Sequence, residues 1–336
     1  MSQIAIIGAG AWGTALSIVL GRKGRQEVRL WAYEEEVFRA IESRRINLRF
    51  LPGHQIPDRV STTQDLAVAL QSAEIVVSAM PSQHCRILFQ RACKHLSDAS
   101  VIVSATKGLE ERTLSRMTEV IREVTMAQGL RCQIAALSGP TFAAEVARGD
   151  PTAIAVACES RELGARVQRE FSDPAFRVYT NDDVVGVELG GALKNVIAIA
   201  AGVCDGLGLG HNSVAALITR GLAEMTRLVV ACGGRPETMA GLAGLGDLVL
   251  TCTGGLSRNR SVGVELGRGR KLPEIITGMR GMVAEGVFTT HAAVELAKAH
   301  QVEMPITEQM HAVLNEGKAP KEAIHDLMTR SFKSEG

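Results

Sequence analysis

A short apolar stretch that runs directly into a glycine-rich turn limits the fold of this chain more than any other feature. Residues 3–7 are typical of a buried strand, the turn Gly8-Ala9-Gly10-Ala11-Trp12-Gly13 follows at once, and residues 14–20 have a helical pattern. A GxGxxG turn alone is a weak signal, but here it joins a strand to a helix near the start of the chain. We therefore expect the first βα unit of a dinucleotide-binding sheet.

Each glycine of this turn has its own expected role. Gly8 would permit the tight turn, Gly10 would let a pyrophosphate approach the backbone, and Gly13 would let the helix pack closely on the strand. The start of the helix would then offer N–H groups and a partial positive charge to the phosphates. The alternative is a tight turn that binds no ligand.

Short runs rich in β-branched residues alternate with helical patterns through the first half of the chain. The further strands expected are residues 27–31, 73–79, 101–105, 134–137, 152–157 and 177–179. Several runs are apolar on both faces, which suits parallel strands covered by helices on both sides. The alternation predicts an α/β fold with a Rossmann-type doubly wound sheet.

Helical periodicity dominates from about residue 183. Asp182 or Asp183 is expected to cap a helix through Ala201, and residues 202–210 are expected to break the helical pattern, with Gly206, Gly208 and Gly210 in a flexible turn. A chain of 336 residues is longer than one core usually serves. We therefore predict a dinucleotide-binding domain over residues 1–182 and an all-helical substrate domain over residues 183–336.

Composition excludes several classes of protein. The formal net charge is +1, so no global field would attract nucleic acid or an anionic membrane. We expect no secretory signal, because no charged n-region with an apolar h-region and cleavage site precedes the first strand. We expect no membrane insertion, because no apolar run approaches the roughly 20 residues that span a bilayer. The 7 cysteines lack a CxxC pair, and the histidines lack ligand spacing. Reduced cytoplasmic thiols, and no metal site, are therefore expected.

Two lysines are candidate chemical groups. Lys107 follows an apolar strand, at the edge where an open α/β sheet binds its ligands. Lys194 lies in an apolar helical stretch after Gly190-Gly191, where burial or a nearby cation would lower its pKa and suit it to proton transfer. The paired glycines suggest that something approaches this helix face. The alternative for Lys107 is a surface lysine at a strand end, and the alternative for Lys194 is a lysine whose side chain extends to water.

Two polar groups in the second half are candidate substrate contacts. Asp247, just after Gly246, could bond a substrate hydroxyl, pair with Lys194, or only shape a turn or cap a helix. Ser257-Arg258-Asn259 precedes a helical pattern, and its hydroxyl, guanidinium and amide would suit a phosphate. A solvated basic turn is the alternative for this second group.

Taken together, these segments resemble bacterial NAD(P)-dependent glycerol-3-phosphate dehydrogenase. The resemblance rests on motifs in the family's order from residue 8 to about residue 290: GAGAWGTALS, SATKGLE, LSGPTFAAEVARGDPTA, GGALKNVIAIAAGVCDGLGLGHNSVAALITRGLAEM, GLAGLGDLVLTCTGGLSRNRSVG and VAEGV. A set spread over nearly the whole chain is far more specific than any single motif.

The resemblance implies that Lys194 accepts the proton in oxidation and donates it in reduction. It implies substrate contacts at Lys107, Gly139, Thr141, Lys194, Asp247, Ser257, Arg258 and Asn259. It implies cofactor contacts at Gly8, Gly10, Ala11, Trp12, Gly13, Tyr33, Phe50, Lys107, Ala143, Arg258, Val283 and Glu285.

The choice between NAD and NADP stays open at this point. An acidic residue at the end of the second strand would bond the ribose 2′-hydroxyl, and an arginine would hold a 2′-phosphate. This chain has Trp31-Ala32-Tyr33-Glu34 there, and Glu34 is late for the acidic role. Many relatives carry histidine or arginine at Ala32 or Tyr33. Arg44, Arg45 and Arg49 are near in sequence but not placed by it.

The expected activity is reversible hydride transfer between NAD(P)H and dihydroxyacetone phosphate, which would supply sn-glycerol 3-phosphate for phospholipids. The resemblance also implies a cytoplasmic homodimer. One alternative is a related two-domain reductase of another hydroxy or keto acid, because the Ser257–Asn259 group could also fit a carboxylate. Another is a redox sensor that binds the dinucleotide without turnover, in which Lys107, Lys194 and Asp247 would have no task.

Overall fold

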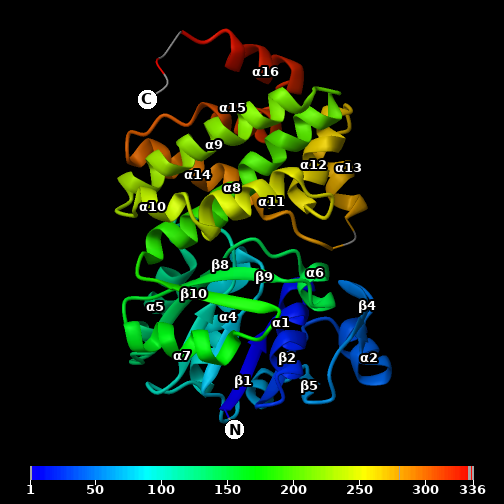
Figure 1. Cartoon of the computed structure of the whole chain (residues 1–336), viewed down its shortest axis with the longest axis vertical. Coiled ribbons are helices and arrows are strands. Elements are labelled where there is room, and N and C mark those ends of the chain that lie inside the picture. Colours follow the sequence, from blue (N-terminus) through cyan, green and yellow to red (C-terminus); the bar gives the residue numbers. More distant parts are fainter. Residues whose placement is uncertain (1, 280, 332–333, 335–336) are drawn as a thin grey trace.

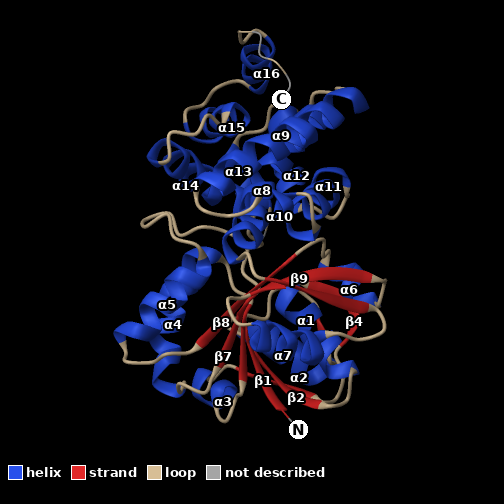
Figure 2. Cartoon of the chain, turned by 60° about the vertical axis from the view of Figure 1, so that its left-hand side comes forward, coloured by secondary structure: helices blue, strands red, loops and turns tan. Residues whose placement is uncertain are grey.

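A twisted sheet with helices on both faces forms the N-terminal half of the molecule, and a helical part lies above it (Figures 1 and 2). The computed structural model describes residues 2–279, 281–331 and 334. The strands are β1 (Ser2–Ile7), β2 (Gln26–Trp31), β3 (Ile46–Asn47), β4 (Leu51–Gln55), β5 (Val60–Thr63), β6 (Ile75–Ser78), β7 (Val101–Ser104), β8 (Gln133–Ser138), β9 (Thr152–Ala157) and β10 (Phe176–Asn181). This architecture confirms the predicted fold class.

The main sheet has the order β10-β9-β8-β7-β6-β1-β2-β5, while β3 and β4 pair separately. The helices of this half are α1 (Ala11–Arg22), α2 (Glu35–Arg44), α3 (Leu66–Leu70), α4 (Cys85–Ala92), α5 (Met117–Ala127), α6 (Ala143–Arg148) and α7 (Arg161–Phe171). The parallel pairs from β5 to β8 bring the carboxyl ends of β1, β2, β6, β7 and β8 to one edge. This edge faces the helical part.

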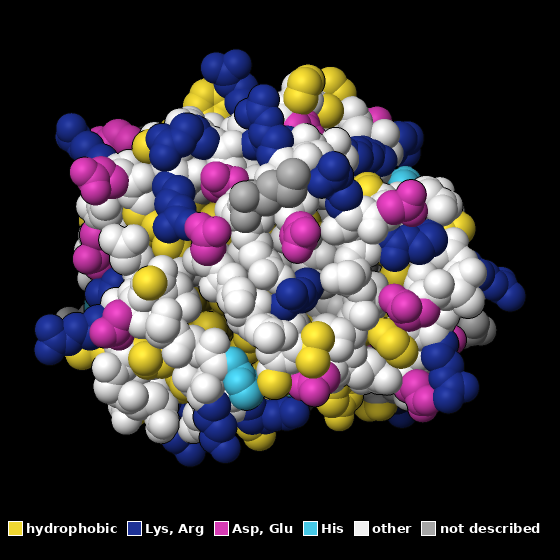
Figure 3. All heavy atoms as spheres, turned by 90° about the horizontal axis from the view of Figure 1, so that it is seen from below, with side chains coloured by type: hydrophobic (Ala, Val, Ile, Leu, Met, Phe, Trp, Pro, Cys, Tyr) yellow, Lys and Arg dark blue, Asp and Glu magenta, His cyan; other side chains and the backbone are white. Residues whose placement is uncertain are grey.

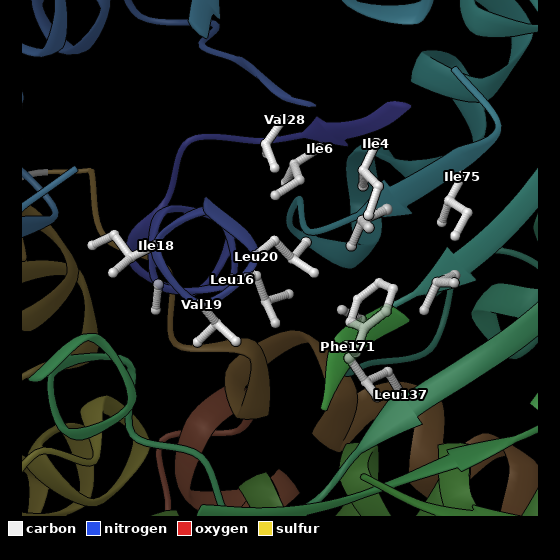
Figure 4. Packing of buried hydrophobic residues seen from close by; sticks show 14 of the residues in the cluster. Ile4, Ile6, Leu16, Ile18, Val19, Leu20, Val28, Ile75, Leu137 and Phe171 are labelled. Atoms are coloured by element: carbon white, nitrogen blue, oxygen red, sulfur yellow. The ribbon is translucent and has the colours of Figure 1, made fainter. Parts of the chain in front are cut away.

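Alternating residues of β1 are buried on opposite faces of the sheet. Ile4 and Ile6 join the cluster packed on α1 and α7, which Figure 4 shows from close by. Ala5 and Ile7 join the cluster packed on α3, α4 and α5. Burial on both faces is the physical reason that this strand is apolar throughout.

The expectation of parallel strands is wrong at one end of the sheet. β9 runs antiparallel to β8, with Ala136 opposite Ala157 and Ser138 opposite Ala155, and β10 then runs parallel to β9. An apolar run such as that of β9 is buried between neighbours in either direction, so its composition does not report direction. The segments β3, β4 and β5 were also not predicted. β4 contains proline and glycine, and β5 is mostly polar.

In the described residues from 183 onward, the regular structure is helical. The helices are α8 (Val184–Gly206), α9 (His211–Ala231), α10 (Pro236–Met239), α11 (Asp247–Thr253), α12 (Arg258–Gly267), α13 (Leu272–Gly278), α14 (Glu285–Ala299), α15 (Pro305–Asn315) and α16 (Pro320–Met328). The side chain of Asp183 caps α8 by accepting from the backbone N–H of Gly186 at 2.8 Å. Asp183, and not Asp182, is therefore the cap.

The predicted break at residues 202–210 is also wrong in its extent, because α8 continues to Gly206. A Cβ on Gly202 would lie 2.0 Å from the Arg260 carbonyl oxygen, and one on Gly206 would lie 2.2 Å from that of Val264. These glycines let the backbones of α8 and α12 touch. Only Gly208, with φ +74°, has the left-handed conformation expected of a turn glycine.

α8 is the central helix of the helical part, and its apolar character reflects that position. Among the described residues it is the one single helix long and apolar enough to cross a membrane, but 89% of its most apolar window is buried inside the protein. A helix that is apolar all round is expected at the centre of a large core.

Candidate active site

Lys107 lies in the loop after β7, and its side chain is 16% exposed among polar groups. Its Nζ donates to the carbonyl oxygen of Gly139 at 2.8 Å and contacts the Thr141 hydroxyl at 3.5 Å. The same ammonium lies 2.6 Å from Asp247 Oδ2. Burial lowers the pKa of Lys107 from 10.5 to about 8, with Asp247 opposing and Lys194 assisting the change. A surface lysine at the strand end is thereby ruled out.

Lys194 reaches the same carboxylate from the middle of α8. Its Nζ donates to Asp247 Oδ1 at 2.9 Å and to the hydroxyl of Thr251 at 2.7 Å. The Asp247 side chain is 1% exposed. Burial alone would raise its pKa, but the two lysines hold the pKa of Asp247 below its ordinary value. We name Lys107, Lys194, Asp247 and Thr251 the lysine–aspartate cluster.

The local fold explains how Asp247 enters this cluster. A π-helical turn at Leu242–Gly246 leads into α11, and Asp247 is the first residue of that helix. Thr251, one turn later, donates its hydroxyl to the backbone carbonyl of Asp247 at 2.6 Å. Asp247 is therefore neither an isolated turn residue nor a helix cap, and both its carboxylate oxygens are bonded to lysine.

The paired glycines of α8 admit other parts of the protein. A Cβ on Gly191 would lie 2.3 Å from Ser138 Oγ and 3.6 Å from Lys107 Cγ. A Cβ on Gly190 would lie 2.7 Å from the Ala243 carbonyl oxygen. The close approach expected at this helix face is thus made by β8 and the turn before α11. It brings Lys107 and Lys194 to one carboxylate.

A second buried carboxylate ties α8 to the sheet half. Glu188 accepts from the Thr118 backbone N–H at 2.8 Å, from the Thr118 hydroxyl at 2.5 Å and from Arg116 Nη1 at 2.7 Å. Burial raises the pKa of Glu188, and Arg116 and Thr118 oppose that rise. This anchor joins the helix of Lys194 to the end of the loop that carries Lys107.

The Ser257–Asn259 group lies at the start of α12. The Ser257 side chain caps the helix by accepting from the Arg260 backbone N–H at 3.2 Å. The Asn259 amide is occupied on both sides, since it donates to Asn195 Oδ1 at 2.8 Å and accepts from the Gly286 N–H at 2.9 Å. Arg258 is exposed as a residue, but burial lowers the pKa of its guanidinium against the opposing charge of Glu285, and it has no hydrogen bond to the residues that the structure describes.

The glycine turn after β1 has the geometry that its spacing predicts. Gly8 has φ +115°, and a Cβ there would lie 2.7 Å from the Ala79 carbonyl oxygen. A Cβ on Gly13 would lie 1.9 Å from the Gly8 carbonyl oxygen, so α1 packs against the turn itself. A Cβ on Gly10 would meet nothing within 4 Å. The turn is thus tight where protein approaches and open at Gly10.

Asn47 is a buried residue of this region that sequence reasoning missed. Its Nδ2 donates to the Ala9 carbonyl oxygen and to the Thr14 hydroxyl, each at 2.8 Å, while its Oδ1 accepts from the Phe50 N–H at 3.0 Å. Asn47 thereby holds Phe50 beside the glycine turn. Tyr33, in contrast, is 72% exposed just after β2. Asn47 belongs to no motif, so its spacing gave no signal.

Glu285, at the start of α14, reaches across to the sheet half. It accepts from the Ser82 hydroxyl at 2.6 Å and from the Ser82 backbone N–H at 3.1 Å. A Cβ on Gly108, next to Lys107, would lie 3.0 Å from Glu285 Oε2. Burial raises the pKa of Glu285, and the nearby charge of Arg258 opposes this. Val283 precedes this helix, and Ala143 begins α6.

The structure therefore brings predicted substrate residues into two linked groups. In the first group, Lys107 contacts Gly139, Thr141 and Asp247. Lys194 contacts the same carboxylate of Asp247. The Asn195–Asn259 bond ties α12 to the residue next to Lys194. Two hollows of about 760 and 380 Å³ on the described surface lie elsewhere, against β10 and α10 and at the opposite edge of the sheet.

Comparisons with known proteins agree along the whole chain. Residues 3–164 match the family model of the NAD-dependent glycerol-3-phosphate dehydrogenase N-terminus, and residues 183–325 match that of its C-terminus. The NAD(P)+ glycerol-3-phosphate dehydrogenase of Koribacter versatilis is 68% identical over 100% of this chain and 99% of its own. That of Acidobacterium capsulatum is 54% identical, covering 100% of both chains. The crystal structure of glycerol-3-phosphate dehydrogenase from Coxiella burnetii superposes with a TM-score of 0.93 at 41% identity, over 98% of this chain and 99% of that one.

Proposed function

We propose, from the premise that this chain belongs to the NAD-dependent glycerol-3-phosphate dehydrogenase family, that it interconverts dihydroxyacetone phosphate and sn-glycerol 3-phosphate with NAD or NADP as the hydride carrier. The observation that carries the proposal is the lysine–aspartate cluster, in which two buried ammonium groups share one carboxylate beside the carboxyl end of β7. Such a cluster can give a proton to an oxygen that gains negative charge.

The glycine turn fits a dinucleotide. Gly10 leaves open space where its Cβ would stand, and it begins α1 without a side-chain cap, so the first N–H groups of the helix remain for a phosphate. The indole Nε1 of Trp12, in the same turn, is buried without a hydrogen-bond partner among the described residues. Bound nicotinamide would supply the hydride that reduces the carbonyl carbon of the substrate.

In this proposal Lys194 is the proton-transfer residue. It gives a proton to the substrate oxygen as the carbonyl becomes an alcohol, and it takes that proton back in the oxidative direction. The hydride adds to carbon and the proton adds to oxygen, so atoms and charge balance. The charge of Lys107 stabilises the developing alkoxide, while Asp247 and Thr251 hold Lys194 in position.

The start of α12 is the proposed phosphate site. Arg258 offers a guanidinium that no described residue occupies, and guanidinium groups bind phosphate oxygens in pairs. Because the Asn259 amide is bonded on both sides, we assign its substrate contact to the backbone N–H in the first turn of α12. Gly139 and Thr141 complete the substrate site beside Lys107.

The proposed cofactor contacts surround the glycine turn. Ala11, Trp12, Tyr33 and Phe50 would line the adenosine and pyrophosphate, and Ala143, Val283 and Glu285 would line the remainder. We further propose that the enzyme is a cytoplasmic homodimer that feeds phospholipid synthesis. The division at residues 182 and 183 would place the two substrates at the junction of sheet and helices.

Purified protein, dihydroxyacetone phosphate and either NADH or NADPH test the function, with nicotinamide absorbance as the readout. Lys194→Ala should remove at least about 99% of turnover while leaving dinucleotide affinity within about threefold. Lys298→Ala is the matched control, because that lysine is exposed and pairs only with Glu295 at the surface. Turnover of another keto acid in place of dihydroxyacetone phosphate would favour the reductase alternative. Dinucleotide binding with no turnover would favour the sensor.

A further inference from the structure

We propose that this enzyme binds NAD(H) in preference to NADP(H), because the ribose end of its dinucleotide site is acidic and the neighbouring arginines are committed elsewhere. This inference rests on the proposed function, since it assumes that the glycine turn binds a dinucleotide. It concerns the choice between NAD and NADP, which the sequence leaves open.

Hydrogen bonds place the end of β2 directly beside the glycine turn. The Gly8 N–H donates to the Trp31 carbonyl oxygen at 3.2 Å, and the Ala32 N–H donates to the Thr63 carbonyl oxygen at 2.9 Å. In a Rossmann unit, the residues just after this strand meet the adenosine ribose and choose between its 2′-hydroxyl and a 2′-phosphate. The residues that hold this position here are Ala32, Tyr33 and Glu34.

The first two of these residues offer no cation. Ala32 is buried and has no polar side chain, and Tyr33 is a neutral, exposed ring 6.0 Å from the ring of Trp31. Glu34 stands at the N-cap position of α2 without a side-chain capping bond, and Glu35 and Glu36 occupy the first turn. The partial positive charge of this helix start is therefore already matched by three carboxylates. A 2′-phosphate, which carries nearly two negative charges, would meet repulsion there.

The arginines close in sequence are paired with other groups or lie away from the ribose end. Arg39 pairs with Glu35 at 2.5 Å, one helical turn away. Arg45 donates to the Val60 carbonyl oxygen at 2.8 Å and to that of Pro57, so its guanidinium is held at the start of β5. Arg44 lies in the last turn of α2, about 15 Å along the helix from Glu34.

Arg49 is the arginine nearest to the glycine turn through its neighbour Phe50. Its guanidinium lies over the Phe50 ring, 5.0 Å from the centroid, and 3.4 Å from Glu36 Oε2. A Cβ on Gly281 would lie 2.5 Å from Arg49 Nη2, so this side chain also contacts the segment before α14. Arg49 thus has an acidic partner already, and a 2′-phosphate would have to displace it.

Equilibrium binding of NADH and NADPH to the wild-type protein tests the preference without turnover, by calorimetry or by the fluorescence of the bound nicotinamide. ADP-ribose and its 2′-phosphate serve as competitors that lack the nicotinamide. We expect NADH and ADP-ribose to bind at least about tenfold more tightly than their 2′-phosphorylated forms. The penalty on the phosphorylated forms should shrink as salt is raised, because the repelling carboxylates are solvent-accessible.

Two variants separate local charge from a general effect. Tyr33→Arg places a guanidinium beside the ribose and should raise the affinity for NADPH relative to that for NADH about tenfold. Glu42→Gln makes the same change of one positive unit at an exposed position farther along α2 and should leave the ratio of affinities unchanged. Equal or tighter binding of NADPH by the wild type would overturn the preference and leave the dehydrogenase intact. Failure of all four ligands to bind would instead overturn the dinucleotide site itself.

Discussion

Replacing Asp247 by asparagine is the most informative single change in the lysine–aspartate cluster. The amide keeps the size of the carboxylate and can still accept one hydrogen bond, but it removes the negative charge shared by Lys107 and Lys194. Two ammonium groups, 16% and 9% exposed, would then face each other without a counter-charge. The change tests whether Asp247 keeps Lys107 protonated.

The structure sets the size of the effect. Removing one partner from a buried ion pair costs about 3–5 kcal/mol. Part of that cost is avoided if a lysine releases its proton, and each unit of pKa lost by Lys107 corresponds to about 1.4 kcal/mol. The pKa of Lys107 is already about 8, and Asp247 is among the charges that support it. In Asp247→Asn this pKa should therefore fall below 8, by about one unit or more.

The consequence for reduction follows from the direction of the shift. Lys107 stabilises the developing alkoxide when it is protonated, so reduction should decline as the pH rises through the pKa of Lys107, which is about 8 in the wild type. A lower pKa moves that decline to lower pH. We expect Asp247→Asn to move the basic limb of the pH profile of kcat down by about one unit, and to reduce kcat at neutral pH about a hundredfold.

Steady-state reduction of dihydroxyacetone phosphate from pH 6 to 10, at roughly saturating dinucleotide, measures both quantities. Asp182→Asn is the control, because it breaks an exposed ion pair with Arg235. A variant whose basic limb coincides with that of the wild type, with kcat reduced or not, would refute a role for Asp247 in holding Lys107 protonated.

Three further changes test other parts of the structure. Gly10→Ala should weaken dinucleotide binding about tenfold or more with an unchanged Tm, because the added methyl enters open space and not protein, as calorimetry and thermal unfolding would show. Gly202→Ala should lower the unfolding free energy by about 1–3 kcal/mol, since its Cβ would meet a carbonyl of α12, whereas Gly210→Ala, which meets nothing within 4 Å, should not; denaturant unfolding compares them. Glu224 accepts from the Ile306 N–H at 2.8 Å and its pKa is raised to about 7 by burial, so the native state holds a proton that the unfolded state loses above about 4.5. The stability of the wild type relative to Glu224→Gln should therefore fall as pH rises from about 5 to 7, and a flat difference would contradict that burial.

Much of the fold was predictable because burial leaves a pattern in the sequence. The doubly buried β1, the glycine turn and the cap of α8 each depend on residues close in the chain. The direction of β9 was not predictable, because an apolar strand packs equally well either way. The length of α8 was underestimated for a related reason: Gly202 serves contact with α12, a partner some 60 residues away that no local pattern reveals.

The candidate site divides in the same manner. Lys107, Lys194 and Asp247 stood out because a charge within an apolar or glycine-rich segment is unusual. Thr251, Ser82 and Asn47 are ordinary polar residues in sequence, and only the fold brings them to a lysine, a glutamate and the glycine turn. Their positions depend on long-range packing, which leaves no signal in spacing.

The mixed surface charge agrees with the small net charge. Figure 3 shows basic and acidic side chains interspersed over the end of the molecule that carries the N-terminus, with hydrophobic side chains scattered between them. No broad field of one sign covers that face. Local cations such as Arg258 are therefore the groups available to attract a phosphorylated substrate.

The order of elements along the chain also sets when the site can exist during synthesis. The sheet is complete at Asn181, so it can fold while the helices are still being made. Lys107 and Asp247 are 140 residues apart, which corresponds to roughly ten seconds or more of translation. A nascent chain would thus contain the glycine turn and Lys107 before Asp247, the counter-charge of Lys107, is synthesised. Arg116 is likewise synthesised before its partner Glu188. The sheet half would therefore present Arg116 and Lys107 when α8 emerges from the ribosome.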